Sequence, residues 1–174
     1  MECTRRDLFR GMIRPGFWQQ SRARIPMPYT DDPAALRTVC LACAAARNGA
    51  APGCQTACGE SIVRLDDAGV PYLDVSQAGC TYCGDCAAAC GPAALDTDVG
   101  RRIAADIILA RGGCLAWNRT MCIQCADRCP DRAVVFAGLW NPVVDDEACT
   151  RCGLCVAACP VDAIEITARV GGRP

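Results

Sequence analysis

The chain has 174 residues, 17 cysteines, no histidine and a formal net charge of −1. Without histidine there can be no Rieske centre, no C-x-x-C-H haem attachment and no histidine general base. Nucleic-acid binding is not expected, because the basic residues, all of them arginine, gather on no motif beyond the N-terminal tail. With only 5% aromatic residues the hydrophobic core is thin, so metal sites or disulfides are expected to stabilise it.

Residues 1–30 form an arginine-rich tail that prolines interrupt. Two interpretations stay open: a segment that packs over the core, or an arm that docks on a partner protein. Thr4–Arg10 is similar to a twin-arginine export signal. The apolar segment that export requires does not follow, because Arg14 and Pro15 break it. No stretch of 18 uncharged apolar residues is present, so we expect no membrane span.

Cysteines dominate the rest of the chain, in four groups of four. Two of the groups read C-x2-C-x2-C-x3-C without interruption, which is the spacing of thiolate ligands around a [4Fe–4S] cluster. The other two carry insertions of ten residues after Cys43 and seven after Cys114, and a more labile cluster is one alternative there. Cys3 stands apart and is interpreted as an incidental thiol. The sixteen predicted ligands are Cys40, Cys43, Cys54, Cys58, Cys80, Cys83, Cys86, Cys90, Cys114, Cys122, Cys125, Cys129, Cys149, Cys152, Cys155 and Cys159.

Two other uses of so many cysteines fit the sequence less well. Disulfide frameworks belong to oxidising compartments, and cysteines two or three residues apart converge on one point rather than pair at a distance. Structural zinc usually takes two well-separated pairs of ligands, often with histidine. Iron–sulfur clusters are therefore the predicted cofactor, four in number.

The chain also repeats itself. Each half reads as a four-cysteine motif, a short β-hairpin and a second four-cysteine motif, with the hairpins at 62–75 and 133–145. The Ala/Ile/Leu-rich segment 101–113, which ends in two glycines, is predicted to be a linking helix. The predicted fold is α+β, with tandem bacterial two-[4Fe–4S] ferredoxin-like units, short hairpins, short helices and little regular core. Its parts are a tail (1–30), a first unit (31–100), the linking helix (101–113) and a second unit (114–174).

In two-cluster ferredoxins the fourth cysteine of a motif binds the other cluster. Applied within each half, this rule predicts crossed ligation, which holds each pair of clusters close together. The fourth cysteine of each motif is also predicted to start, or to lie on, a short helix. Gly84 and Gly153 occupy matching places in their motifs and are predicted to have positive φ. The four predicted ligand sets are Cys40, Cys43, Cys54 and Cys90; Cys58, Cys80, Cys83 and Cys86; Cys114, Cys122, Cys125 and Cys159; and Cys129, Cys149, Cys152 and Cys155.

The whole pattern resembles the NapF-type ferredoxins, which are iron–sulfur accessory proteins of periplasmic nitrate reductase systems. The resemblance rests on Thr4-Arg5-Arg6, on Cys114-Leu115-Ala116-Trp117 ahead of Cys122, and on the C-terminal motif over 149–164. It implies a cytoplasmic protein that contacts the precursor of the nitrate reductase catalytic subunit before export. Its role would be to support maturation of that subunit by electron transfer. The alternative is an electron-relay ferredoxin subunit of a larger respiratory oxidoreductase, which exchanges electrons with a donor or acceptor protein. No substrate pocket or acid–base pair is readable, so no catalytic activity of its own is expected.

Overall fold

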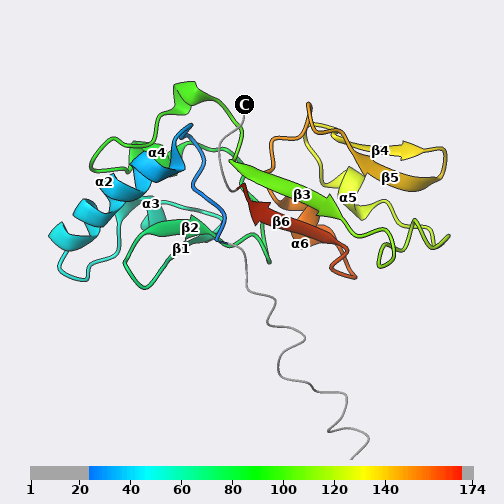
Figure 1. The fold of residues 1–174 in the computed structure, drawn as a ribbon, viewed down its shortest axis with the longest axis horizontal. Helices are drawn as coiled ribbons and strands as arrows, with labels where there is room; N and C mark the ends of the chain where they lie inside the picture. The colour runs from blue at the N-terminus through cyan, green and yellow to red at the C-terminus, as the bar shows by residue number, and fades with distance from the viewer. Residues whose placement is uncertain (1–23, 170–174) are drawn as a thin grey trace, which may run out of the picture.

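The computed structural model describes residues 24–169, and the elements lie along one long axis in two halves (Figure 1). The predictions for Cys3, for Thr4–Arg10 and for the rest of 1–23 lie outside the described residues. In chain order the elements are α2 (Pro33–Ala46), α3 (Gly53–Thr56), β1 (Val63–Leu65), β2 (Pro71–Leu73), α4 (Asp85–Ala88), the 3₁₀ turn η1 (Thr97–Val99), β3 (Ala105–Leu109), α5 (Gln124–Asp127), β4 (Val134–Ala137), β5 (Trp140–Val144), α6 (Leu154–Ala158) and β6 (Ile164–Ala168).

The two predicted hairpins are present, one in each half. Strands β1 and β2 pair antiparallel with Val63 opposite Leu73, and β4 and β5 pair antiparallel with Val134 opposite Val144. Gly69 and Gly138 have positive φ values of 75° and 70°. These lie in the turns, where glycine adopts this conformation without a steric penalty. Each half therefore contains a short hairpin flanked by two cysteine motifs.

The predicted linking helix over 101–113 is wrong. Residues Ala105–Leu109 form strand β3, which pairs antiparallel with the C-terminal strand β6 from Ala105 opposite Ala168 to Leu109 opposite Ile164. Figure 1 shows the two strands side by side between the halves. The apolar run has the β-branched pair Ile107–Ile108, and pairing with a distant strand outweighs the local helix preference of its alanines.

Part of the predicted tail belongs to the core. The side chains of Ile25, Met27 and Tyr29 are only 1%, 1% and 3% exposed. Leu73 N–H donates to the Ile25 carbonyl at 2.8 Å, which adds the tail to hairpin β1–β2. The boundary predicted at residue 30 is therefore too late by several residues, and 24–30 follows the interpretation in which the segment packs over the core.

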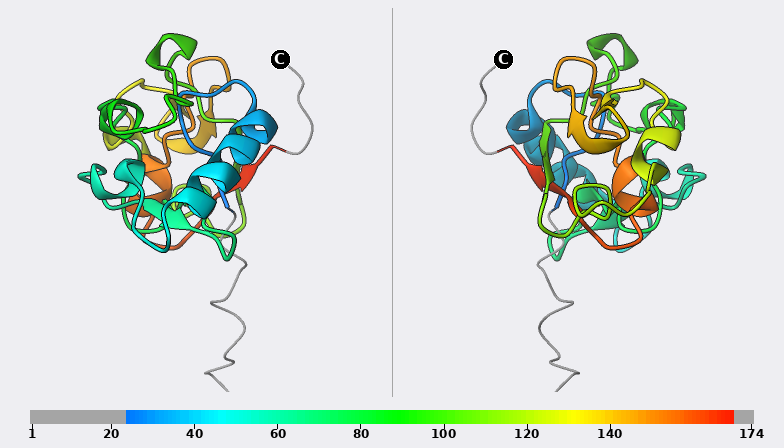
Figure 2. Two further views of the ribbon diagram at one scale, coloured as in Figure 1. Left: turned by 90° about the vertical axis from the view of Figure 1, so that its left-hand side faces the viewer. Right: turned by 90° about the vertical axis from the view of Figure 1, so that its right-hand side faces the viewer.

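Helix α2 carries the first two cysteines of the first motif. Its N-terminus is capped by Asp32, whose side chain accepts hydrogen bonds from the N–H groups of Ala34 and Ala35, and Pro33 occupies the first turn. Cys40 and Cys43 are three residues apart and thus share one face of a helix. The C-x2-C segment of this motif lies in a helix of 14 residues rather than in a tight loop. Viewed from this end, α2 lies in front of the shorter elements (Figure 2).

We expect Asp66→Asn to destabilise the first half by about 1–2 kcal/mol, since a buried carboxylate there accepts several hydrogen bonds. Its side chain is 4% exposed, and it accepts from Ala68 N–H, Val70 N–H and Arg37. Burial acts to raise the pKa of Asp66, but the hydrogen bonds from Val70 and Arg37 outweigh it and hold the pKa below its ordinary value.

The stabilisation by Asp66 is therefore complete above the ordinary carboxyl pKa and is lost only as the pH falls below it. Thermal unfolding should show the same deficit for Asp66→Asn at pH 6 and pH 8. Asp67→Asn is the matched control, because the Asp67 side chain is fully exposed and its loss should change little. A deficit that grows between pH 6 and pH 8 contradicts this assignment.

Candidate iron–sulfur centres

The third cysteine of every motif lies on a short helix. In each case it is the second residue of the helix, and the fourth cysteine follows where the helix ends. The prediction that the fourth cysteine starts or lies on the helix is thus wrong, and the third cysteine takes that place. Gly84 and Gly153 precede α4 and α6 with φ values of 86° and 82°, which confirms the predicted positive φ. The helical cysteines are Cys54, Cys86, Cys125 and Cys155.

The same turn follows the fourth cysteine in all four motifs. The residue three positions later has positive φ (Ser61, Ala93, Arg132 and Asp162, between 49° and 55°). In three of the motifs a backbone N–H four residues on donates to the cysteine sulfur: Ala94 to Cys90 at 3.4 Å, Ala133 to Cys129 at 3.2 Å and Ala163 to Cys159 at 3.2 Å. Backbone N–H groups on thiolate sulfur stabilise negative charge and adjust the potential of an iron–sulfur site.

The fold gathers the cysteines into sets that combine three from one motif with one from its neighbour. The first set consists of Cys40 and three thiols that are near enough to raise its pKa by charge repulsion, those of Cys54, Cys90 and Cys43. The other three sets each line one cavity. These are Cys58, Cys80, Cys83 and Cys86; Cys129, Cys149, Cys152 and Cys155; and Cys114, Cys122, Cys125 and Cys159.

Burial shapes the chemistry of these thiols. It raises the pKa of Cys86 and of Cys155 to about 12, and that of Cys40 and of Cys80 to about 11, with neighbouring cysteines adding to the rise. The free thiols are therefore protonated near neutral pH. Metal binds the thiolate, so loading of these sites must release protons.

The donor sets fit a [4Fe–4S] cluster. Each set offers four soft sulfur ligands around one point, which is the ligand chemistry of iron–sulfur sites. Within residues 24–169 no three or more Cys, Asp or Glu side chains are close enough together to hold a single metal ion. The four cysteine sulfurs around a cubane lie farther apart than four sulfurs around one ion. A cluster therefore requires sets of cysteines that are more widely spaced than a single-ion site.

Two of the sets meet at the contact between the halves. Cys80 N–H donates to the Cys152 carbonyl at 2.7 Å, and the Tyr82 hydroxyl donates to the Thr150 carbonyl at 2.6 Å. The charge of Cys152 also contributes to the raised pKa of Cys80. The second and fourth motifs are thus direct neighbours.

Glycines allow this close approach. A Cβ on Gly79 would collide with the backbone of Leu154, and one on Gly153 would lie 2.6 Å from Cβ of Val75. Sequence reasoning gave Gly153 a conformational role and missed its packing role, and it missed Gly79 altogether. The position of Gly79 directly before Cys80 was the available signal.

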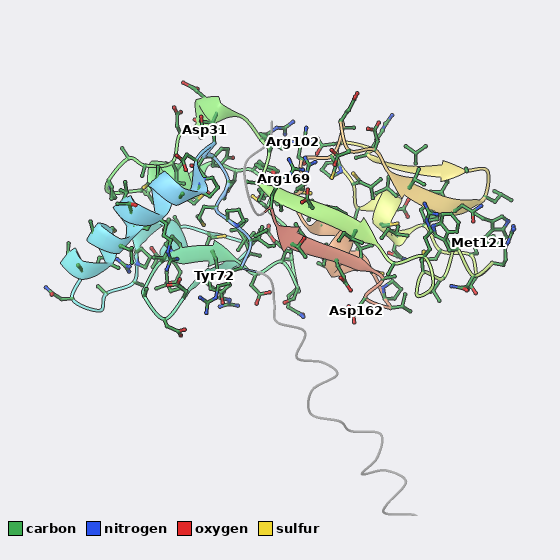
Figure 3. The ribbon with its side chains drawn as sticks, in the orientation of Figure 1. Asp31, Tyr72, Arg102, Met121, Asp162 and Arg169 are labelled. Atoms are coloured by element: carbon green, nitrogen blue, oxygen red, sulfur yellow. The ribbon has the colours of Figure 1, made fainter. Side chains whose placement is uncertain are left out.

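Arg169, the residue after β6, forms an ion pair with Asp106 of β3. Its Nε and Nη2 donate to Asp106 Oδ1 at 2.9 and 2.6 Å, beside the start of β3 (Figure 3). Met121, at the outer end of the second half in that view, is 81% exposed.

Among the described residues, no helix is both long and apolar enough to cross a membrane.

Comparison with known proteins agrees with the site. A family model described as a 4Fe-4S binding domain matches residues 142–165, which include all four cysteines of the last motif. The ferredoxin-type protein NapF of Escherichia coli K12 is 31% identical over 163 residues, covering 91% of this chain and 93% of that protein. The ferredoxin-type protein NapG of the same strain is 27% identical over 83% of this chain and 71% of its own length. The methylamine utilization ferredoxin-type protein MauM of Methylorubrum extorquens is 29% identical over 69% and 66%. The chain therefore belongs to the NapF family of ferredoxin-type iron–sulfur proteins.

Proposed function

We propose that the sixteen cysteines bind four [4Fe–4S] clusters with crossed ligation in each half. The main support is the grouping of thiols, in which the fourth cysteine of each motif lies with three cysteines of the neighbouring motif. Each cluster, when bound, supplies a site that accepts and releases one electron. The protein's own part is to hold the sulfurs, donate backbone N–H groups to them and limit access of water.

We further propose a linear electron route through the chain. The groups that contain Cys40 and Cys80 share the first half, and those that contain Cys149 and Cys114 share the second. The contact between Cys80 and Cys152 supports transfer between the halves at the second and fourth motifs. The outer groups are then the two ends at which partner proteins would exchange electrons.

The role that best accounts for such a route is support of nitrate reductase maturation. Similarity to NapF over nearly the whole length of both proteins is the observation that carries this proposal. The partner would be the precursor of the periplasmic catalytic subunit, met in the cytoplasm before its export. The protein would supply electrons during assembly of that subunit's cofactors and would have no catalytic site of its own.

A steady electron-relay subunit of a respiratory oxidoreductase is the second candidate. The similarity to a methylamine utilization ferredoxin-type protein supports it, since related sequences then also occur outside nitrate reductase systems. The two candidates differ in the protein that co-purifies, either an unexported nitrate reductase precursor or a membrane-bound respiratory complex.

Anaerobic iron and sulfide analysis with EPR of the reduced protein tests cluster binding. Four clusters predict about sixteen iron and sixteen sulfide per chain. Stoichiometric zinc with almost no iron would refute the proposal.

Deletion of residues 1–23 tests the partner role. The deleted segment contains five arginines and ends before the buried Ile25. We expect the truncated protein to keep its iron and to lose capture of the tagged nitrate reductase precursor. The control keeps the length and replaces the five arginines with glutamine, which tests charge separately. Capture that survives the deletion excludes 1–23 as the contact surface.

A further inference from the structure

Arg151 is a buried cation inside the fourth cysteine motif. It lies between Cys149 and Cys152 and is only 1% exposed. Its Nη1 donates to the Cys149 carbonyl at 3.1 Å, and its Nη2 pairs with Asp146 at 2.5 Å. Its Nε is buried and has no hydrogen-bond partner among the described residues. Leaving a buried donor of a charged group unpaired is costly, so a negative neighbour is expected there.

The cavity beside Arg151 supplies that neighbour when loaded. Arg151 lines the same cavity as Cys129, Cys149, Cys152 and Cys155. Its guanidinium is held beside this set by the hydrogen bond that Nη1 donates to the Cys149 carbonyl at 3.1 Å. Four thiolates around a cluster would place net negative charge in this cavity.

We propose that Arg151 raises the reduction potential of the cluster held by Cys129, Cys149, Cys152 and Cys155, and so makes it the preferred electron acceptor between the halves. The inference rests on the cluster binding proposed above. Reduction adds one negative charge to the cluster, and a buried cation stabilises that charge more strongly than an exposed one. Arg151 thus favours the reduced state of this cluster without being one of its ligands.

Among the described residues, the other motifs contain no fully buried cation; Arg47 of the first motif, whose charge also acts on Cys40, is partly exposed. The residue directly before the second cysteine is Ala42, Tyr82 or Met121 in the first three motifs and Arg151 in the fourth. Tyr82 is the partner across the junction. Its phenol carries no charge at neutral pH. The two neighbouring sites at the junction therefore differ by one buried positive charge, that of Arg151, and electrons should collect on its side.

The nearby carboxylates cancel this charge only in part. Asp146 pairs with Arg151 but is 78% exposed, so water weakens its effect on the cavity without removing it. Asp131 also lines the cavity, but it accepts a hydrogen bond from the Thr150 hydroxyl at 2.7 Å and lies 3.9 Å from Arg101. Asp106 is paired with Arg169. Arg151 is the buried member among these charged groups.

An EPR-monitored redox titration of the iron-loaded protein tests the inference. Arg151→Gln should lower the reduction potential of one cluster by at least about 59 mV, which corresponds to a tenfold change in the equilibrium constant of its one-electron reduction. Arg151→Lys should retain most of the wild-type potential. Arg102→Gln is the matched control, because Arg102 pairs with the same Asp146 but is 48% exposed, and it should leave the potential unchanged. The affected signal should be the one that disappears in Cys155→Ala.

The outcomes separate the two proposals. A wild-type protein without a cluster at this site refutes the proposed function. Full iron in Arg151→Gln with an unchanged potential refutes the role of Arg151 alone. If Arg151→Gln does not retain iron, Asp146→Asn decides, because loss of the paired carboxylate should raise the potential. An unchanged or lower potential in that variant also overturns the inference.

Discussion

Alanine at both Cys40 and Cys90 is expected to remove one cluster, leaving about twelve of about sixteen irons. Both cysteines belong to the same predicted set, because the fourth cysteine of the second motif lies with the first three of the first motif. Once Cys40 is lost, the additional loss of Cys90 should cost no further iron. Anaerobic iron and acid-labile sulfide content per chain provides the measurement.

The matched control is the double variant Cys40→Ala with Cys58→Ala. These two cysteines belong to one motif but to different predicted sets, since Cys58 lines the cavity of Cys80, Cys83 and Cys86. This variant should lose two clusters and keep about eight irons. If ligation followed the motifs without crossing, the two results would be reversed. The comparison holds the number of lost thiols constant, so general destabilisation does not explain a difference.

Local sequence carried the prediction of the cysteine groups and hairpins. Ligand spacing depends on a few consecutive residues, and the hairpins are marked by apolar runs and turn glycines such as Gly69 and Gly138. The positive φ of Gly84 and Gly153 could be predicted for the same reason, because matching glycines mark a backbone requirement. Each of these features is decided by one continuous stretch of the chain.

Features that depend on distant partners were not readable. Strand β3 was predicted as a helix because its partner β6 lies nearly sixty residues later, and composition alone does not reveal that pairing. Helix α2, which carries Cys40 and Cys43, was not predicted, although Asp32 and Pro33 are residues typical of a helix start. Arg151 lines a cavity with residues as distant in sequence as Ile107, so its sequence position between two cysteines suggested no role.

Gly153 and Gly84 provide a matched single-methyl test of the contact between the halves. Gly153→Ala and Gly84→Ala both place a side chain at positive φ, which costs about 1–2 kcal/mol. Only Gly153→Ala also brings a methyl group to 2.6 Å from Val75, whereas the nearest atom to the new methyl in Gly84→Ala lies at 3.8 Å. Overpacking of this kind costs about 1–3 kcal/mol more. We therefore expect Gly153→Ala to lower the Tm of the iron-loaded protein about twice as far as Gly84→Ala.

Val75→Ala tests the cause of that difference. In the Gly153→Ala background it removes the two Cγ atoms that lie 2.8 Å from the new methyl and keeps Cβ at 2.6 Å, so it relieves part of the clash. The double variant should therefore be more stable than the sum of the two single effects. Val75→Ala with Gly84→Ala should be additive, because these residues share no close contact at the glycine. Equal effects of the two glycine variants, or additivity in both pairs, would show that Val75 does not limit the approach of the halves. The junction at Cys80 and Cys152 would then tolerate a side chain at residue 153, and the close packing invoked for electron transfer between the halves would lose its support.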